Sequence, residues 1–74
     1  MDAYSIRLQI QIDREQDGRW IADIPSLAGV MAYGPTREAA IASVKALALR
    51  VIANEIEHGE RGRDPQSVLF DLGA

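Results

Sequence analysis

The sequence predicts a small α+β domain in which an antiparallel three-stranded sheet is followed by one long helix and a short fourth strand. Three observations lead to this prediction. Apolar and polar residues alternate over residues 4–13, which is the period of a strand with one buried face. Proline and glycine then interrupt residues 23–36, which indicates short strands joined by turns. Over residues 37–58, apolar residues recur at the spacing of a helix.

The first two strands are expected to form an antiparallel hairpin. Residues 14–18 are polar and end in Asp17 and Gly18, a pair more typical of a tight turn than of a cation-binding loop. The second strand should cover residues 19–24, with Ile21 pointing away from the core. The core face of the two strands should hold Tyr4, Ile6, Leu8, Ile10, Ile12, Trp20, Ala22 and Ile24.

The stretch that follows should contain a turn, a third strand and the start of the helix. Pro25 cannot donate a hydrogen bond to a sheet, so the second strand should end there. Gly29 allows the chain to reverse before a third strand at residues 30–33. A Gly-Pro pair should break that strand, and the hydroxyl of Thr36 should cap the first turn of the helix.

The expected helix runs over residues 37–58 and stops at Gly59. Its inner stripe, which should cover the sheet, consists of Ala40, Ile41, Val44, Leu47, Ala48, Val51 and Ile52. Its outer stripe consists of Ala39, Ala42, Ala46, Leu49, Ala53 and Ile56. The outer stripe has two interpretations. Alanine simply favours helix, or Leu49 and Ile56 form a close contact with a second protomer or another protein.

After the helix, a polar loop at residues 60–66 should lead to a short final strand at residues 67–71. The loop contains Arg61, Gly62 and Arg63, a trio that resembles a fragment of RNA-binding sequence. In an acidic chain these arginines more plausibly form a solvated loop.

The residues at these turns also carry a resemblance to a known family. The order and spacing of the following residues resemble the HicB-like antitoxin family: Asp17, Gly18, Trp20, Ala22, Pro25, Leu27, Gly29, Gly34, Thr36, Glu38 and Ala39. The resemblance covers residues 4–71 and implies a partial ribonuclease-H-like fold with three strands, a helix and a fourth strand. The chain departs from the family at Ala28 and Val30, where members often have proline and cysteine. These departures affect turn stiffness and packing rather than chemistry.

Composition favours one small domain over residues 1–74 that associates with a partner. The chain has 74 residues, no cysteine, and a net charge of -3 from eleven acidic and eight basic residues. A domain of this size has a small core, so we expect a homo-oligomer, either a dimer or a tetramer. The negative charge argues against a nonspecific grip on DNA or RNA. The sequence shows no signal peptide or membrane span, so a cytoplasmic location is expected.

The residues offer little for catalysis, and we expect neither an enzyme nor a bound cofactor. His58, the only histidine, lies where a helix end would hold it against free carbonyls. A magnesium-dependent nuclease would need grouped carboxylates, for which the candidates are Asp13, Asp23, Glu55 and Asp71. We interpret these four as surface or turn acids, and the resemblance implies a fold that has lost its nuclease centre.

The sequence therefore predicts a binding module. The resemblance implies an antitoxin that occludes a HicA-like toxin, a small basic ribonuclease that cleaves messenger RNA. The candidate partner-binding residues are Trp20, Tyr33, Leu49 and Ile56, together with the polar face of the sheet at Arg7, Gln9, Gln11 and Ile21. Trp20 more plausibly belongs to the core, whereas for Tyr33 both roles stay open. The alternative is an orphan adaptor that assembles with itself. Larger family members add a DNA-binding module, which we do not expect in this chain.

Overall fold

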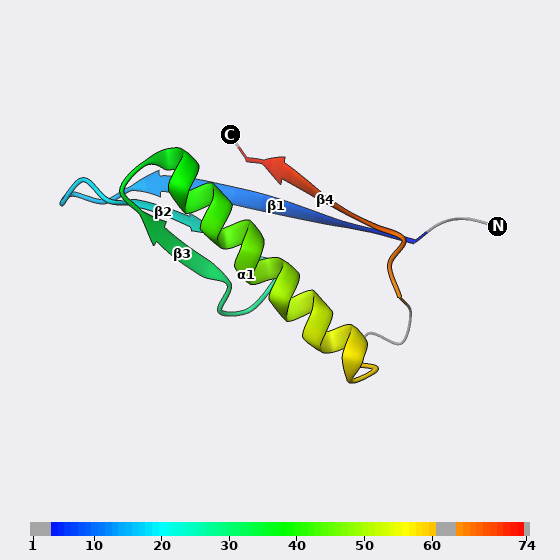
Figure 1. Ribbon diagram of the computed structural model, residues 1–74. Helices are drawn as coiled ribbons and strands as arrows, with labels where there is room; N and C mark the ends of the chain where they lie inside the picture. Colours follow the sequence, from blue (N-terminus) through cyan, green and yellow to red (C-terminus); the bar gives the residue numbers. More distant parts are fainter. Residues whose placement is uncertain (1–3, 61–63, 74) are drawn as a thin grey trace.

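A computed structural model describes residues 4–60 and 64–73 of the chain. Its elements are β1 (Ser5–Arg14), β2 (Trp20–Asp23), β3 (Met31–Gly34), α1 (Arg37–Glu57) and β4 (Ser67–Leu72), as Figure 1 shows. This confirms the predicted α+β class and the order of three strands, one helix and a fourth strand. Arg61, Gly62 and Arg63 lie outside the described residues.

The four strands form one mixed sheet in the order β3-β2-β1-β4. The pairs β1–β2 and β2–β3 are antiparallel, as predicted, whereas β4 lies parallel to β1 with Ser5 opposite Ser67. A parallel pair requires a crossover connection, because the chain must return to the end at which the first strand began. The helix provides that connection, since it carries the chain from the β3 edge back to the β4 edge (Figure 1).

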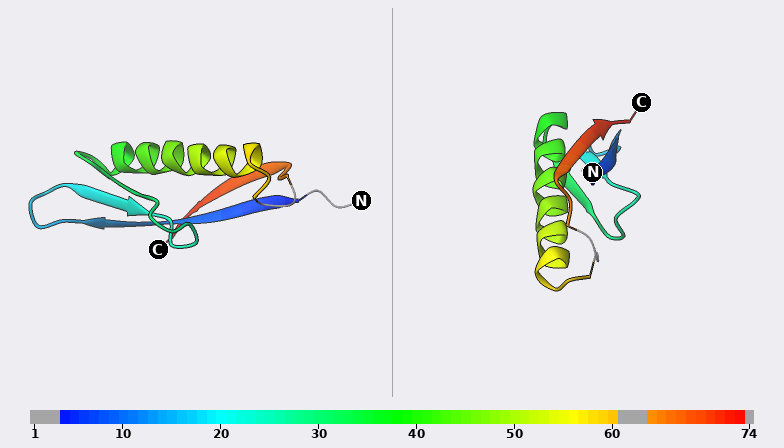
Figure 2. Two further views of the ribbon diagram at one scale, coloured as in Figure 1. Left: turned by 90° about the horizontal axis from the view of Figure 1, so that it is seen from below. Right: turned by 90° about the vertical axis from the view of Figure 1, so that its right-hand side faces the viewer.

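The core lies between α1 and one face of the sheet, and the opposite face carries no covering layer among the described residues (Figure 2). The buried core residues are Ile6, Leu8, Ile10, Ala22, Ile24, Val30, Ala40, Val44, Ala48 and Ile52. Four of them recur every fourth residue along α1, and the remaining inner-stripe residues pack against this core. The predicted alternation in β1 and the predicted inner stripe are therefore confirmed.

The helix begins and ends as the sequence predicts. Thr36 has extended backbone angles, and its hydroxyl accepts a 3.1 Å hydrogen bond from the Ala39 amide. At the other end, the amide of His58 donates to the carbonyl of Asn54, and Gly59 has a φ of +67°, the left-handed conformation that glycine adopts easily. The His58 ring also lies against that carbonyl, with Nδ1 2.7 Å from the oxygen.

The third strand begins and ends one residue later than predicted. Val30 belongs to the preceding turn, because its carbonyl accepts from the amide of Ile24 and its amide donates to the carbonyl of Leu27. Gly34 is then the last residue of β3 and does not simply interrupt the strand. It meets a steric requirement, since a Cβ at this position would lie 2.5 Å from the amide nitrogen of Ala40.

In the described part of the chain, no helix is both long enough and apolar enough to cross a membrane. The helix α1 has 21 residues, but charged residues recur on its outward side.

We expect Gly34→Ala to lower the free energy of unfolding by about 1–3 kcal/mol, because the added methyl group would push the first turn of α1 away from β3. Chemical denaturation followed by circular dichroism measures this change. Ser43→Ala is the control, because Ser43 is exposed on the helix and should change stability by less than about 0.5 kcal/mol. Equal stability of Gly34→Ala and the unsubstituted protein would contradict the proposed close contact.

Candidate functional site

The uncovered side of the sheet, called here the open face, is the surface where exposed apolar and acidic side chains come together. Strand register determines its composition. Ile21 lies between Asp13 on β1 and Tyr33 on β3, and Asp23 lies between Gln11 and Met31 in the next row. Neighbouring strands pair directly, so these side chains emerge on the same side of the sheet.

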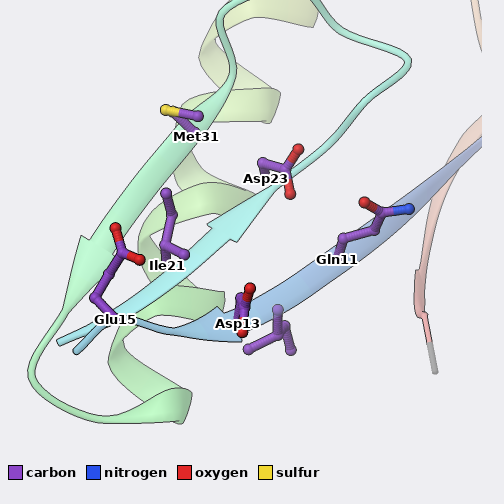
Figure 3. Close-up of a pocket in the computed structure, with 7 residues that line it drawn as sticks. Gln11, Asp13, Glu15, Ile21, Asp23 and Met31 are labelled. Carbon is purple, nitrogen blue, oxygen red and sulfur yellow. The ribbon is translucent and has the colours of Figure 1, made fainter. Parts of the chain in front are cut away.

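A hollow of about 540 Å³ lies on the β1–β2–β3 half of the open face, and we call it the acidic hollow (Figure 3). Its lining residues are Gln11, Ile12, Asp13, Glu15, Ile21, Asp23 and Met31. Within the described ranges, none of its three carboxylates has a basic side chain within 4 Å. Asp13 accepts a hydrogen bond from the Arg14 amide, and Glu15 accepts a long one of 3.5 Å from the Tyr33 hydroxyl. The carboxylates thus keep most of their capacity to accept hydrogen bonds.

The other half of the open face, between β1 and β4, has balanced charge. Arg7 lies opposite Leu69 and reaches diagonally across the parallel pair to Asp71, with which it forms an ion pair of 3.3 Å between Nε and Oδ2. The hydroxyls of Ser5 and Ser67 lie 2.7 Å apart. Leu69 is exposed between these pairs. The two halves of one face therefore differ in electrostatic character.

Arg19 links the hairpin turn to β3 at the end of the open face. Its guanidinium carbon lies 4.4 Å from the centre of the Tyr33 ring, a cation–π contact, and its Nε lies 2.7 Å from Oδ2 of Asp17. Asp17 also accepts from the Arg19 amide. The hydrogen bond from the Arg19 amide contributes most to lowering the pKa of Asp17, and the contact with the Arg19 guanidinium lowers this pKa further. Arg19 is thus already engaged by this turn and by the tyrosine ring.

The four predicted partner-binding residues lie on three different surfaces. Trp20 is half-buried on the helix side of the sheet, where it packs against the core and lies under the Arg14 guanidinium at 5.5 Å. The structure therefore supports the core interpretation of Trp20. Tyr33 lies on the open face with 44% of its surface exposed. Leu49 and Ile56 lie on α1, away from both aromatic residues.

The outer stripe of α1 is only partly covered by the rest of the described chain. Leu49 is 47% exposed and Ile56 is 37% exposed. Among the alanines, Ala42, Ala46 and Ala53 are exposed and Ala39 is half-buried. The exposure of the outer stripe in the described chain leaves both of its interpretations open.

The sequence pattern indicated Ile21 and Tyr33 as surface candidates but did not indicate that Met31, Asp23 and Glu15 belong to the same surface. The missing information was the register between β2 and β3, which places Met31 opposite Asp23. The alternation of side chains along a strand could have predicted part of this surface, because Met31 and Tyr33 are two residues apart and so share a face.

The four acidic residues considered for metal-dependent catalysis do not form one group. Asp13 and Asp23 share the acidic hollow, Asp71 pairs with Arg7, and Glu55 lies near the end of α1. No group of three histidine, cysteine, aspartate or glutamate side chains in the described ranges is arranged to hold a metal ion. The arrangement of the acidic hollow instead suits contact with a positively charged, partly apolar group.

No protein-family model, curated protein or solved structure matches the chain. The hypothesis of a HicB-like relationship therefore depends on the motif residues and on their positions in the fold.

Proposed function

We propose that the chain is a HicB-like antitoxin that binds and occludes a HicA-like toxin that cleaves messenger RNA. The observation that carries this proposal is the coincidence of motif and fold. Residues that carry the resemblance lie at structural transitions: Gly18 in the hairpin turn, Gly29 between β2 and β3, Gly34 against the helix, and Thr36 at its cap. The order of elements is also the order that the resemblance implies.

We further infer that the fold is the partial ribonuclease-H-like fold of that family. In support, three strands precede one long helix, and the fourth strand returns beside the first. Of the four candidate acidic residues, Asp13 and Asp23 share the acidic hollow, whereas Asp71 pairs with Arg7 and Glu55 lies on α1. Four acidic residues that do not converge suit a domain that binds its partner and does not cleave RNA.

The proposed mechanism is steric and electrostatic occlusion. A HicA-like toxin binds RNA through a positively charged surface, and this chain has a net charge of -3. Opposite charges would accelerate the encounter of the two proteins, while buried apolar contacts would slow their separation. The bound antitoxin would then block the surface on which the toxin binds the RNA backbone. This would take place in the cytoplasm, where messenger RNA is available.

Co-expression with the product of the adjacent reading frame, which the proposal expects to be a small basic ribonuclease, tests the proposal. We expect the two proteins to copurify, and we expect co-expression to relieve the growth arrest that the ribonuclease causes alone. The matched control is a toxin whose catalytic histidine is replaced, which should copurify equally well without arresting growth. Failure of the unsubstituted pair both to copurify and to restore growth would refute the antitoxin proposal.

The alternative function is an orphan adaptor that assembles with itself, and the exposed outer stripe favours it. Leu49 and Ile56 lie one heptad apart and are flanked by exposed alanines, a spacing that suits close packing of two helices. Self-association would use the outer stripe of α1, whereas toxin binding would use a different surface. One chain could therefore form a dimer and bind a toxin at the same time.

We expect the double substitution Leu49→Glu and Ile56→Glu to shift a dimer or tetramer to the monomer, because each buried leucine or isoleucine contributes about 1.5–3 kcal/mol. Light scattering after size-exclusion chromatography measures the mass. Ser43→Glu with Asn54→Glu is the matched control, since it adds the same charge at exposed positions of α1 outside the stripe. An unchanged mass for the stripe variant would end the self-assembly interpretation.

A further inference from the structure

We propose that the acidic hollow and the exposed apolar residues beside it form the docking surface for a basic protein segment, and that an arginine side chain of that segment occupies the hollow. The naming of the toxin as the source of that segment depends on the proposed function above. The chemistry of the surface depends on its residues alone.

The surface places apolar and acidic side chains next to one another. Met31 is 49% exposed and Tyr33 is 44% exposed on the edge strand β3, while Ile21 is half-buried beside them on β2. Asp13, Glu15 and Asp23 lie around Ile21, and Met31 lies at the β3 side of this group (Figure 3). Apolar side chains mixed with polar groups are the usual composition of a protein interface.

The geometry suits arginine because that side chain has both an apolar stem and a charged, planar head. The stem can lie along Ile21 and Met31, while the head donates to carboxylates on two strands. The chain itself shows a similar contact nearby, where the Arg19 guanidinium stacks on Tyr33 and binds Asp17. A partner's arginine would extend this arrangement across the open face.

Charge distinguishes this occupant from two others. Phosphate groups of RNA or DNA would meet three carboxylates without a basic side chain within 4 Å among the described residues. A second copy of the chain packed symmetrically on this surface would bring the same carboxylates together, because a two-fold contact places a patch against itself. A basic partner is the occupant that neutralises these three carboxylates.

The two halves of the open face can be compared with each other, because both expose an apolar side chain but, among the described residues, only one has carboxylates without an ion pair. On its β1–β4 half, Arg7 already neutralises Asp71, and Leu69 offers an apolar side chain of similar exposure to Met31. If apolar exposure alone attracted the partner, both halves would bind it. If opposite charge is also required, binding is confined to the β1–β2–β3 half.

The test uses the full chain and a fluorescently labelled synthetic peptide in which arginine alternates with leucine, followed by fluorescence anisotropy at low and at physiological ionic strength. The test variant is Asp13→Asn with Asp23→Asn. The matched control is Glu57→Gln with Glu60→Gln, at exposed positions at the end of α1. Each pair removes two of the eleven acidic residues, so the net charge changes from -3 to -1 in both. Circular dichroism confirms that each variant is folded.

We expect the hollow variant to bind the peptide at least about tenfold more weakly than the unsubstituted chain, with a reduced dependence on salt, and the control variant to change little. An equal loss in both variants would show that only net charge matters and would overturn the proposal. Absence of peptide binding by the unsubstituted chain would also overturn it.

The same variants in the co-expression experiment separate the two proposals. If the unsubstituted chain and both variants copurify with the ribonuclease equally well, the docking surface is wrong and the antitoxin proposal stands. If the ribonuclease never copurifies while the peptide binds the hollow, the surface is right and the toxin is not its partner.

Discussion

The structure depends on one constraint, which is that a single helix must cover a four-stranded sheet. The helix does this with a stripe of side chains four residues apart, and two of the four buried ones are alanines, which allow the backbone of α1 to approach the sheet closely. Gly34 extends the same close approach to the start of the helix. Because one helix covers only one face, the second face of the sheet and the outer stripe of α1 stay in contact with water. The exposed apolar residues on these surfaces add support for a binding function.

Local sequence patterns predicted the parts of this fold that depend on local physics. Alternation in β1 places Ile6, Leu8 and Ile10 in the core, and the cap at Thr36 and the left-handed Gly59 bound the helix. The pairing of strands that are far apart in the sequence was harder to predict. Nothing in residues 67–72 specifies a parallel partner, and β4 acquires one because the helix returns the chain to the start of β1. The steric need for Gly34 was hidden for the same reason, since the atoms that crowd it belong to residues 39 and 40.

The candidate site was only partly predictable, because it depends on register. The sequence indicated that Ile21 points away from the core, but Met31 and Asp23 join it through the β2–β3 pairing. That pairing also separates Tyr33 from Trp20, which the sequence treated as similar candidates. Charge then distinguishes two halves of one surface, with an ion pair on one and three carboxylates beside exposed apolar side chains on the other. An acidic, partly apolar surface is suited to covering a basic protein surface, which is how the proposed antitoxin would act.

Methyl NMR of the chain labelled at isoleucine, leucine and methionine, titrated with the basic ribonuclease, tests this account most directly. Ile21 and Met31 report on the open face, and Leu49 and Ile56 report on the outer stripe of α1. The account predicts that the methyl signals of Ile21 and Met31 shift on binding, while those of the β1–β4 half, such as Leu69, stay in place. Shifts confined to Leu49 and Ile56, with Ile21 and Met31 unchanged, would contradict it.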